Sequence, residues 1–379
     1  MAGLSAPDGR NVLALNCGSS SLKFGLYRVT ADDASLLFEG EAEEIGSTRA
    51  QFWIRHKSNE DKHRRAGAIP DHQAALAQAL QSLKESGAPD LDAAGHRFVH
   101  GGPKLREHQI IRPGTVDVLQ EAIAFAPLHM PAALAVLKQL GNRLPKLVQA
   151  VCFDTAFHNT LPDVSRQFPL SAEVRRLGVE RFGFHGLSLE SVLAQMTEIP
   201  QRLVVAHLGN GCSITAIRHG LSIDTTMGLT PTGGIMMGTR CGDLDPGVLL
   251  FAMQHGFSDR DRLSTLVDHQ SGLLGVSETT SDVRELLEKR TRDERADLAL
   301  RMFSYQVKKA IGSMSAALGG LDKLVFAGGI GENNAELRKE LAAELGYLGR
   351  FEVAVIPSQE DLQIARITDR LLTSSRDPA

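Results

Sequence analysis

Apolar and polar residues alternate in two similar segments, one near the start of the chain and one just past its middle. Residues 12–27, VLALNCGSSSLKFGLY, contain an apolar run, a polar turn and a second alternating run, which predicts a β-hairpin. Residues 203–218, LVVAHLGNGCSITAIR, repeat this order. Aligning Gly18 with Gly211 also aligns Ser20 with Ser213. The pair predicts a duplicated domain, with a chance pair of short hairpins as the open alternative.

Apolar periodicity predicts further strands and helices throughout the chain. Helical spacing is found at residues 73–83, 116–125, 131–140 and 293–318, and apolar strand runs at 35–38, 95–99, 147–153, 202–207, 323–327 and 351–356. We expect Gly141 to end the third helix, Ser281 to cap a short helix, and the glycines of 328–333 to form a loop before another helix. This mixture of strands and helices predicts the α/β class.

The first turn carries groups that suit phosphate. Asn16, Gly18, three serines and Lys23 supply an amide, hydroxyls, backbone N–H groups and an ammonium within a few residues. A plain serine-rich surface hairpin is the alternative, because serine and glycine favour turns in any case. The glycines of 328–333, after a strand and before a helix, indicate a second place for nucleotide phosphate or ribose.

Length and composition limit the kind of protein. With 379 residues, the chain is longer than one core usually organises, so we expect two domains. The net charge is −4, and we expect no nucleic-acid partner. Apolar runs are too short to span a membrane, and the first residues do not resemble a secretory signal. Four widely spaced cysteines fit reduced thiols, so we expect a cytoplasmic protein.

Eight segments, in order along the chain, resemble the acetate kinase family. They are LNCGSSSLKF (15–24), HRFVHGG (96–102), APLHMPA (126–132), FDTAFH (153–158), RFGFHG (181–186), AHLGNG (206–211), MGTRCGDLDPG (237–247) and GGIGEN (328–333). The resemblance implies two duplicated α/β domains of the actin-like ATPase (ribonuclease H-like) type around a nucleotide cleft. The implied division is an N-terminal domain of 1–154, joined by about 363–379, and a C-terminal domain of 155–362.

The resemblance also implies residue roles, carried over by matching position. Asp154 would be the catalytic aspartate, Arg97 and Arg240 would hold the acid and the phosphoryl group, and His185 would stabilise the transition state. The acid would be bound by Arg97, Val99, Leu128, His129, Phe184 and Pro231. ATP or ADP would be bound by Lys23, His207, Leu208, Gly209, Asn210, Gly211, Asp282, Val283, Arg284, Gly329, Ile330, Gly331, Glu332 and Asn333. Mg²⁺, with Mn²⁺ as a second candidate, would be positioned by Asn16 and Glu360.

The chain departs from the family pattern in three places. Met130 stands where an asparagine is usual, Cys241 stands where a serine is usual, and the stretch between Gly346 and Val353 is expected to be short. None of these positions carries an assigned catalytic role.

The implied chemistry suits these residue types. A carboxylate acceptor is already ionised near neutral pH, so phosphoryl transfer to it needs positive charge more than a base. Arginine supplies such charge because it stays protonated and pairs with oxyanions through two N–H groups. We therefore interpret Asp154 as orienting Mg²⁺ or its water, with proton shuttling as the open alternative. Taken singly, Arg97 and Arg240 also fit salt bridges, and His185 fits a core histidine.

The sequence thus predicts reversible, ATP-dependent phosphorylation of acetate to acetyl phosphate by direct in-line transfer, in a homodimer. Two alternatives stay open. One is a kinase for propionate or another short-chain acid, and the other is a non-acyl ATPase or nucleotide-binding regulator of the same superfamily. The acids that yield an acyl phosphate in a hydroxamate assay separate the three.

Overall fold

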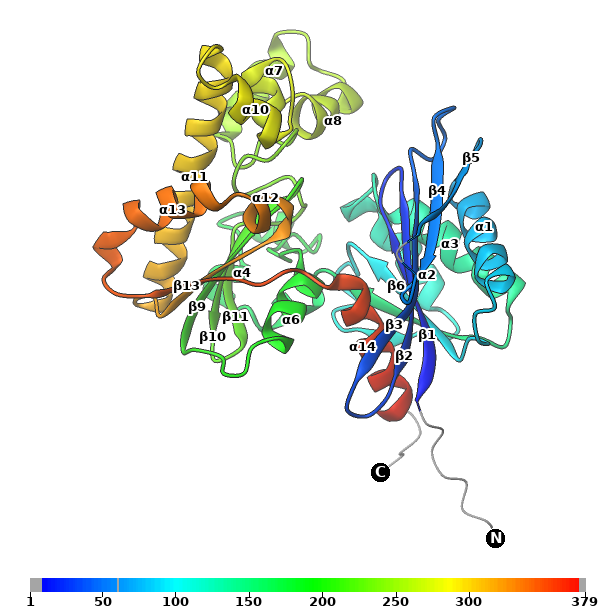
Figure 1. Ribbon diagram of the computed structural model, residues 1–379. Helices are drawn as coiled ribbons and strands as arrows, with labels where there is room; N and C mark the ends of the chain where they lie inside the picture. The colour runs from blue at the N-terminus through cyan, green and yellow to red at the C-terminus, as the bar shows by residue number, and fades with distance from the viewer. Residues whose placement is uncertain (1–8, 60, 375–379) are drawn as a thin grey trace. The chain divides into compact units, whose positions relative to one another are not determined.

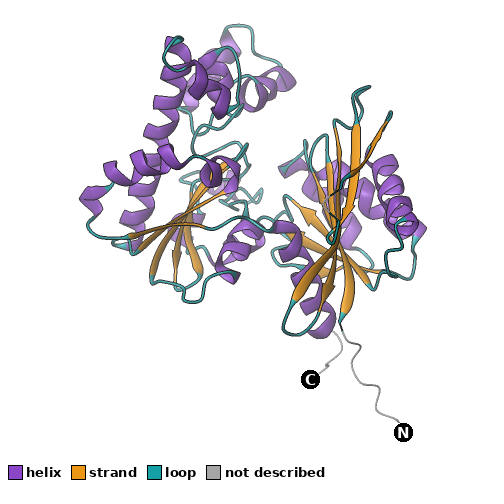
Figure 2. Ribbon diagram, viewed as in Figure 1, coloured by secondary structure: helices purple, strands orange, loops and turns teal. Residues whose placement is uncertain are grey.

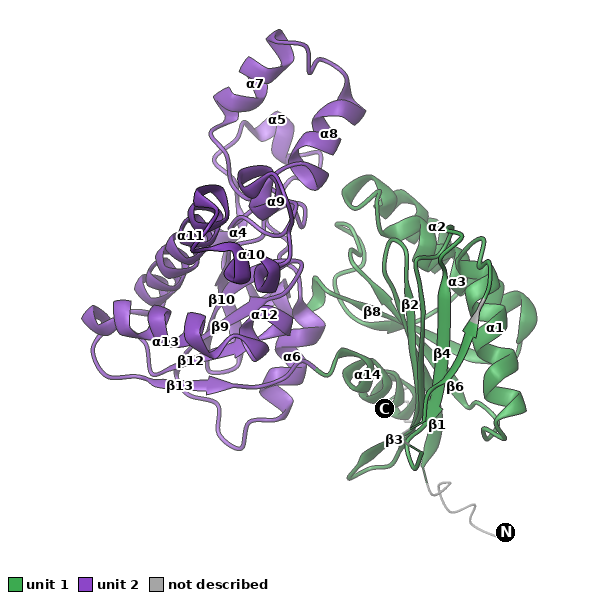
Figure 3. Ribbon diagram, turned by 45° about the horizontal axis from the view of Figure 1, so that its top comes forward, with its two compact units in different colours: residues 1–156, 359–379 green, residues 157–358 purple. Residues whose placement is uncertain are grey.

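Two compact units make up the computed structural model, which describes residues 9–59 and 61–374. Unit 1 comprises residues 1–156 and 359–379, and unit 2 comprises 157–358 (Figure 3). The sequence-based division resumes the first domain near residue 363, whereas the chain returns to unit 1 at residue 359. Glu360, which that division assigns to the second domain, therefore belongs to unit 1.

Unit 1 is built on an eight-stranded sheet in the order β5-β4-β3-β2-β1-β6-β8-β7. The strands are β1 (Arg10–Cys17), β2 (Leu22–Val29), β3 (Ala34–Glu43), β4 (Gln51–His56), β5 (His63–Ala66), β6 (Ala93–Phe98), β7 (Gln109–Ile110) and β8 (Val148–Phe153). Strands β1 to β5 form an antiparallel meander, while β6 and β8 run parallel to β1. The carboxyl ends of β1, β6 and β8 therefore meet at one edge of the sheet.

Helices cover both faces of this sheet (Figures 1 and 2). On one side lie α1 (His72–Glu85), α2 (Thr115–Glu121) with the short η1 (Ala122–Phe125), and α3 (Met130–Arg143). On the other side lies α14 (Glu360–Ser374), which contacts β1, β6 and β2. It packs so closely that a Cβ on Gly95 of β6 would collide with Thr368 and Ile364, so this position requires glycine.

Unit 2 has a five-stranded sheet in the order β11-β10-β9-β12-β13. Its strands are β9 (Arg202–Leu208), β10 (Cys212–Arg218), β11 (Leu221–Thr225), β12 (Lys323–Ala327) and β13 (Glu352–Val355). Helix α6 (Gly186–Ala194) packs on this sheet through Leu189 and Val192, and the long α11 (Glu294–Leu318) also lies against it. The remaining helices are α4 (Asp163–Arg166), α5 (Ala172–Arg175), α7 (Pro246–Gln254), α8 (Arg260–His269), α9 (Gly272–Ser277), α10 (Val283–Lys289), α12 (Gly328–Asn333) and α13 (Ala335–Glu344), with short 3₁₀ turns η2 (Ala156–Thr160) and η3 (Gly346–Leu348).

The two sheets repeat one topology, as the paired hairpins predict. In unit 1, the hairpin β1–β2 is followed by β3 on one side and by the parallel strands β6 and β8 on the other. In unit 2, β9–β10 is followed by β11 and by the parallel β12 and β13. The predicted alignment of the hairpins is wrong, however. The turns are residues 18–21 and 209–211, so Gly18 corresponds to Gly209, and Ser213 is a buried strand residue.

Most predicted elements are present, and the errors lie at their ends. Gly141 does not stop α3, which continues to Arg143. Asp282, not Ser281, caps α10, because its carboxylate accepts from the backbone N–H of Arg284. The glycine segment 328–333 is itself the helix α12 and not a loop. In the described residues, every helix is too short or too polar to cross a membrane.

Candidate active site

Three polar side chains lie together where β1, β6 and β8 of unit 1 end. Asn16 is near the end of β1, Arg97 is near the end of β6, and Asp154 directly follows β8. Parallel strand ends bring side chains from distant parts of the chain to one edge of a sheet. The backbone N–H of Asp154 continues the ladder by donating to the carbonyl of Phe98 at 3.0 Å.

Arg97 is held by contacts on both sides of its guanidinium. Its Nε donates to Asp154 Oδ1 at 2.9 Å and its Nη2 to Oδ2 at 2.6 Å, while Nη1 donates to Asn16 Oδ1 at 2.9 Å. Asp154 is only 2% exposed. Burial raises the pKa of Asp154, and the adjacent guanidinium opposes that rise. Burial alone would lower the pKa of Arg97, but Asp154 and Glu360 outweigh it and keep that pKa above its ordinary value.

Two neighbouring carboxylates at the start of α14 face the same amide. Asn16 Nδ2 donates to Glu360 Oε2 and to Asp361 Oδ1, both at 3.3 Å. Glu360 Oε2 also lies 3.7 Å from Arg97 Nη1. Burial and the negative charge of Glu360 raise the pKa of Asp361 from 3.8 to about 6. Asp361 was not among the predicted site residues, although its position beside Glu360 was a readable signal.

The other predicted residues of unit 1 lie outside this group of contacts. Lys23 is paired across the sheet with Asn16, but its Nζ lies 3.7 Å from Glu41 and its side chain is 55% exposed. Val99 packs partly against the core of unit 1. Leu128 is 43% exposed, and His129 directly precedes α3. Phe184 and Pro231, the other two residues of the predicted apolar wall, belong to unit 2.

In unit 2, two stacked histidines lie beside the second hairpin. The rings of His185 and His207 are 4.2 Å apart and nearly parallel. His185, at the start of α6, has the unusual positive φ of 61°, and its Nδ1 lies 3.0 Å from Ser213 Oγ. His207 Nδ1 lies 2.8 Å from Ser188 Oγ. Both histidines were predicted site residues, whereas Ser213 was noted only as a position of the hairpin and Ser188 was not predicted.

Arg240 and the hairpin glycines adjoin these histidines. A Cβ on Gly211 would lie 3.1 Å from His185 Nε2 and 3.4 Å from Arg240 Nη1. Arg240 Nη1 donates to the carbonyl of Pro231 at 3.3 Å. A Cβ on Gly209 would come within 3.9 Å of the backbone nitrogen of Gly329. The second hairpin turn, His185, Arg240 and the start of α12 are therefore close neighbours within unit 2.

Glycine is required where α12 begins. Gly328 has φ of +76°, and a Cβ there would lie 2.7 Å from the carbonyl oxygen of Leu208, which is buried at the end of β9. Gly329, by contrast, faces open space. Ile330 and Gly331 follow within α12. Asn333 Nδ2 donates back to the Gly329 carbonyl at 2.9 Å.

The predicted adenosine residues of α10 differ in exposure. Arg284 is 86% exposed and bonds to Asp282, while Val283 is 5% exposed.

Two further predicted residues of unit 2 pack against neighbouring segments. Phe184 is 1% exposed, and its carbonyl faces His158 Nε2 at 2.9 Å. A Cβ on Gly238 would lie 2.9 Å from Asn210 Oδ1, so Asn210 packs against the segment around Gly238.

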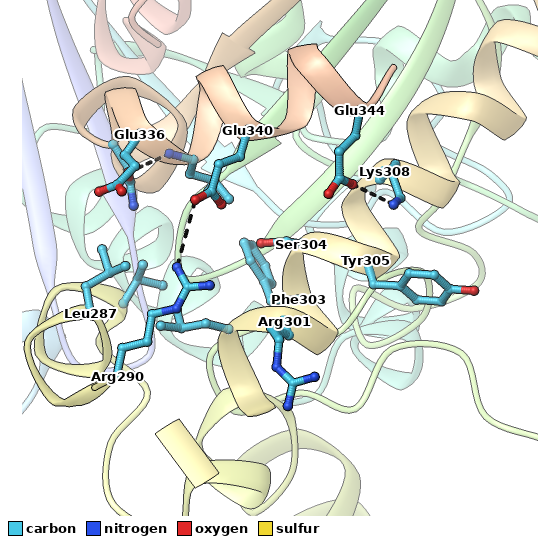
Figure 4. Close-up of a pocket in the computed structure, with 14 residues that line it drawn as sticks. Leu287, Arg290, Arg301, Phe303, Ser304, Tyr305, Lys308, Glu336, Glu340 and Glu344 are labelled. Carbon is cyan, nitrogen blue, oxygen red and sulfur yellow. Dashed lines mark hydrogen bonds and ion pairs between the residues drawn. The ribbon is translucent and has the colours of Figure 1, made fainter. Parts of the chain in front are cut away.

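A cavity of 520 Å³ lies between α10, α11 and α13 (Figure 4). Its walls combine apolar groups, including Val283, with ion pairs between helices. Arg290 Nη1 lies 3.9 Å from Glu340, and Lys308 Nζ lies 2.5 Å from Glu344. Only Val283 belongs both to this cavity and to the predicted nucleotide residues.

Known proteins match this chain over nearly its whole length. The profile of the acetokinase family matches residues 11–369. Acetate kinase from Caldicellulosiruptor saccharolyticus is 36% identical over 400 aligned positions, covering 95% of this chain and 99% of that protein. The alignment is longer than the chain, so the relative has residues that this chain lacks.

Solved structures show the same fold. The crystal structure of Porphyromonas gingivalis acetate kinase matches with a TM-score of 0.86 and 35% identity, covering 96% of this chain and all of that one. A propionate kinase from Francisella tularensis matches with a TM-score of 0.89 and 33% identity over the same shares. From its sequence and its fold, this chain belongs to the acetokinase family.

Proposed function

We propose that this protein is an acetate kinase, which transfers the terminal phosphoryl group of ATP to acetate and gives acetyl phosphate and ADP reversibly. The observation that carries this proposal is the cluster at the ends of β1, β6 and β8, where Arg97 is fixed by Asp154 and Asn16. It occurs in a chain that matches the acetokinase family from residue 11 to residue 369.

The cluster suits the binding of an oxyanion. A guanidinium has more N–H groups than the contacts of Arg97 use, so its terminal nitrogens can still donate to a carboxylate or phosphoryl oxygen. Asp154 fixes the plane of this guanidinium and keeps it charged. We assign Asp154 this orienting role, and no base is needed because acetate is already ionised.

The residues around Asn16 fit a magnesium ion. Mg²⁺ prefers oxygen ligands, and commonly takes one or two protein carboxylates together with water and substrate phosphates. Glu360 and Asp361 place two carboxylates beside one amide, and burial together with repulsion from Glu360 raises the pKa of Asp361. Asn16, Glu360 and Asp361 would hold the ion directly or through water. When bound, Mg²⁺ would neutralise negative charge on the phosphates.

The nucleotide contacts in our proposal come from unit 2. Gly209 to Gly211 form the second hairpin turn, beside His207, His185 and Arg240. Arg240 and His185 would neutralise charge on the phosphoryl group in transfer, which is the main task of protein groups in this reaction. Val99, Leu128, Phe184 and Pro231 stay our proposed contacts for the methyl group of acetate.

The test uses purified protein with ATP, Mg²⁺ and acetate, and traps acetyl phosphate as a hydroxamate. We expect product with the wild type and with Arg175→Ala, which removes an exposed arginine of α5. We expect none above background with Arg240→Ala. ATP hydrolysis that does not depend on any carboxylic acid would instead support the non-acyl ATPase.

Propionate is the second candidate substrate, because one structural neighbour is named a propionate kinase. The same assay with acetate, propionate and butyrate ranks the acids by kcat/KM. One methylene changes binding by about 1–3 kcal/mol, so a preference of roughly tenfold or more is expected for the physiological acid. A profile that peaks at propionate would replace our first assignment.

We propose that two copies associate through α7. None of its residues is buried, and Leu250 and Phe251 are each 63% exposed. A helix this apolar and unburied is typical of an interface. Light scattering should show a dimer for the wild type and for Leu221→Asp, a change at an exposed leucine of β11, and a monomer for Leu250→Asp.

We also propose that the protein acts in a reducing compartment such as the cytoplasm, because its four cysteines are free thiols.

A further inference from the structure

Glu332 of α12 binds protein backbone through one of its carboxylate oxygens. Its Oε1 accepts a hydrogen bond from the backbone N–H of Gly328 at 2.9 Å and another from that of Ser358 at 3.1 Å. Gly328 is the first residue of α12, and Ser358 is the last residue of unit 2 before the chain returns to unit 1. One carboxylate oxygen therefore joins the start of α12 to the exit from unit 2.

Two serines extend this connection to His207. Ser358 Oγ lies 2.6 Å from Ser188 Oγ, and Ser188 Oγ lies 2.8 Å from His207 Nδ1. Ser188 is fully buried and His207 is 8% exposed, so the contact between them is shielded from water, while Ser358 is half-buried. Hydrogen bonds in such surroundings are stronger and fix ring orientation. The Ser188 hydroxyl can donate to Nδ1 or accept from it, so this contact holds the ring in either tautomer.

We propose that Glu332, Ser358 and Ser188 are positioning residues that orient the imidazole of His207 and anchor α12 beside it. This inference rests on the proposed function for the assignment of His207 to the ATP phosphates. It gives Glu332 a role other than the expected contact with the adenosine end of the nucleotide. Oε1 already accepts two backbone N–H groups, so a nucleotide contact would have to use Oε2.

The position of Ser358 gives the network a second consequence. Gln359 and Glu360 follow it directly, and Glu360 opens α14 with one of the carboxylates facing Asn16. The segment that fixes His207 is thus continuous in sequence with the segment that supplies the proposed Mg²⁺ ligands. Loss of the Glu332 contact should therefore disturb catalysis more than nucleotide affinity.

The first test needs no activity. Long-range ¹H–¹⁵N spectra of the histidine rings report the tautomer of His207, with its signals assigned by their loss in His207→Gln. We expect these signals to shift in Ser188→Ala, Ser358→Ala and Glu332→Ala. They should stay in place in Glu198→Ala, which removes an exposed carboxylate of unit 2. Unchanged His207 signals in all three network variants would overturn the proposal, whatever the enzyme's substrate.

The second test separates positioning from nucleotide contact. With ATP and with 2′-deoxy-ATP, Glu332→Ala should lower kcat by roughly tenfold to a hundredfold, as small misplacements of reacting groups do. The ratio of kcat/KM for the two nucleotides should not change. Glu332→Gln should recover most of the activity, because its amide oxygen can accept the same two N–H groups. A rise in KM that is selective for ATP, or a Glu332→Gln variant as poor as Glu332→Ala, would show that Glu332 binds the nucleotide instead.

Discussion

Replacing Asp361 with asparagine should make the protein more stable at neutral pH. Asp361 lies beside Glu360, and burial together with this neighbour raises its pKa from 3.8 to about 6. A carboxyl whose pKa is higher in the folded protein than in the unfolded chain destabilises the fold when it ionises. Asparagine keeps an oxygen for the contact with Asn16 Nδ2 but carries no charge.

The magnitude follows from that difference in pKa. The rise from 3.8 to about 6 corresponds to about 3 kcal/mol, at about 1.4 kcal/mol for each pKa unit. Asp361 is partly exposed, and water reduces the effect, so we expect Asp361→Asn to gain about 1–3 kcal/mol. The gain should be absent below about pH 4, appear between pH 4 and pH 6, and be complete above pH 6.

Urea unfolding of both proteins between pH 4 and pH 8 measures this difference. Comparing variant with wild type at each pH removes the contributions of titrating groups that do not interact with Asp361, including the buried His158. Asp32→Asn, at an exposed turn, is the matched control and should leave stability unchanged at every pH. A gain that does not vary with pH, or a less stable Asp361→Asn protein, would refute the reasoning.

Four further predictions concern stability. Arg97→Ala should lower the free energy of unfolding in urea by about 3–5 kcal/mol, because it leaves Asp154, which is 2% exposed, without its cation. A decrease no larger than that caused by replacing an exposed arginine such as Arg175 would contradict the pairing. Gly328→Ala should cost about 1–3 kcal/mol because of its positive φ and the nearby Leu208 carbonyl, whereas Gly329→Ala, which meets no atom within 4 Å, should cost under about 1 kcal/mol. Burial lowers the pKa of His158 from 6.5 to about 4, so the contribution of His158 to wild-type stability should fall as pH decreases from 6.5 towards 4, and His158→Gln should remove that contribution from the urea profile. Mg²⁺ with ADP should raise the Tm of the wild type more than that of Asp361→Asn, and removing the metal with EDTA should abolish the difference in ligand effect.

The pattern of apolar residues predicted most strands and long helices, because their length and periodicity are strong local signals. Strands β1, β8 and β12 and helix α11 all follow this rule. The pattern of apolar residues failed where tertiary packing determines the secondary structure. Helix α3 runs through Gly141, and α12 forms from a glycine segment because Gly328 packs on Leu208. Helix α7 is apolar although none of its residues is buried. The spacing of its apolar residues does not distinguish it from a helix of the core.

Sequence motifs predicted several residues of the candidate site but not the contacts between them. Asn16, Arg97, Asp154 and Glu360 come from four distant places, and the fold of unit 1 brings them together. Ser188 and Ser358 were missed, because their importance depends on which atoms they face and not on their own residue type. Local sequence could not show that Lys23 is paired with Glu41, since this contact crosses between strands β2 and β3.

The return of the chain to unit 1 has a consequence for biosynthesis. The sheet of unit 1 is begun by β1, yet one of its faces is covered by α14, which leaves the ribosome after the whole of unit 2. Unit 2 is continuous from residue 157 to residue 358 and can close as soon as it has been translated. Unit 1 therefore cannot complete its fold until α14 has been translated. Until then, Gly95 and its neighbours on β6 are exposed to water. A nascent chain arrested before residue 359 should accordingly resist proteases over 157–358 while its first 156 residues remain open to cleavage.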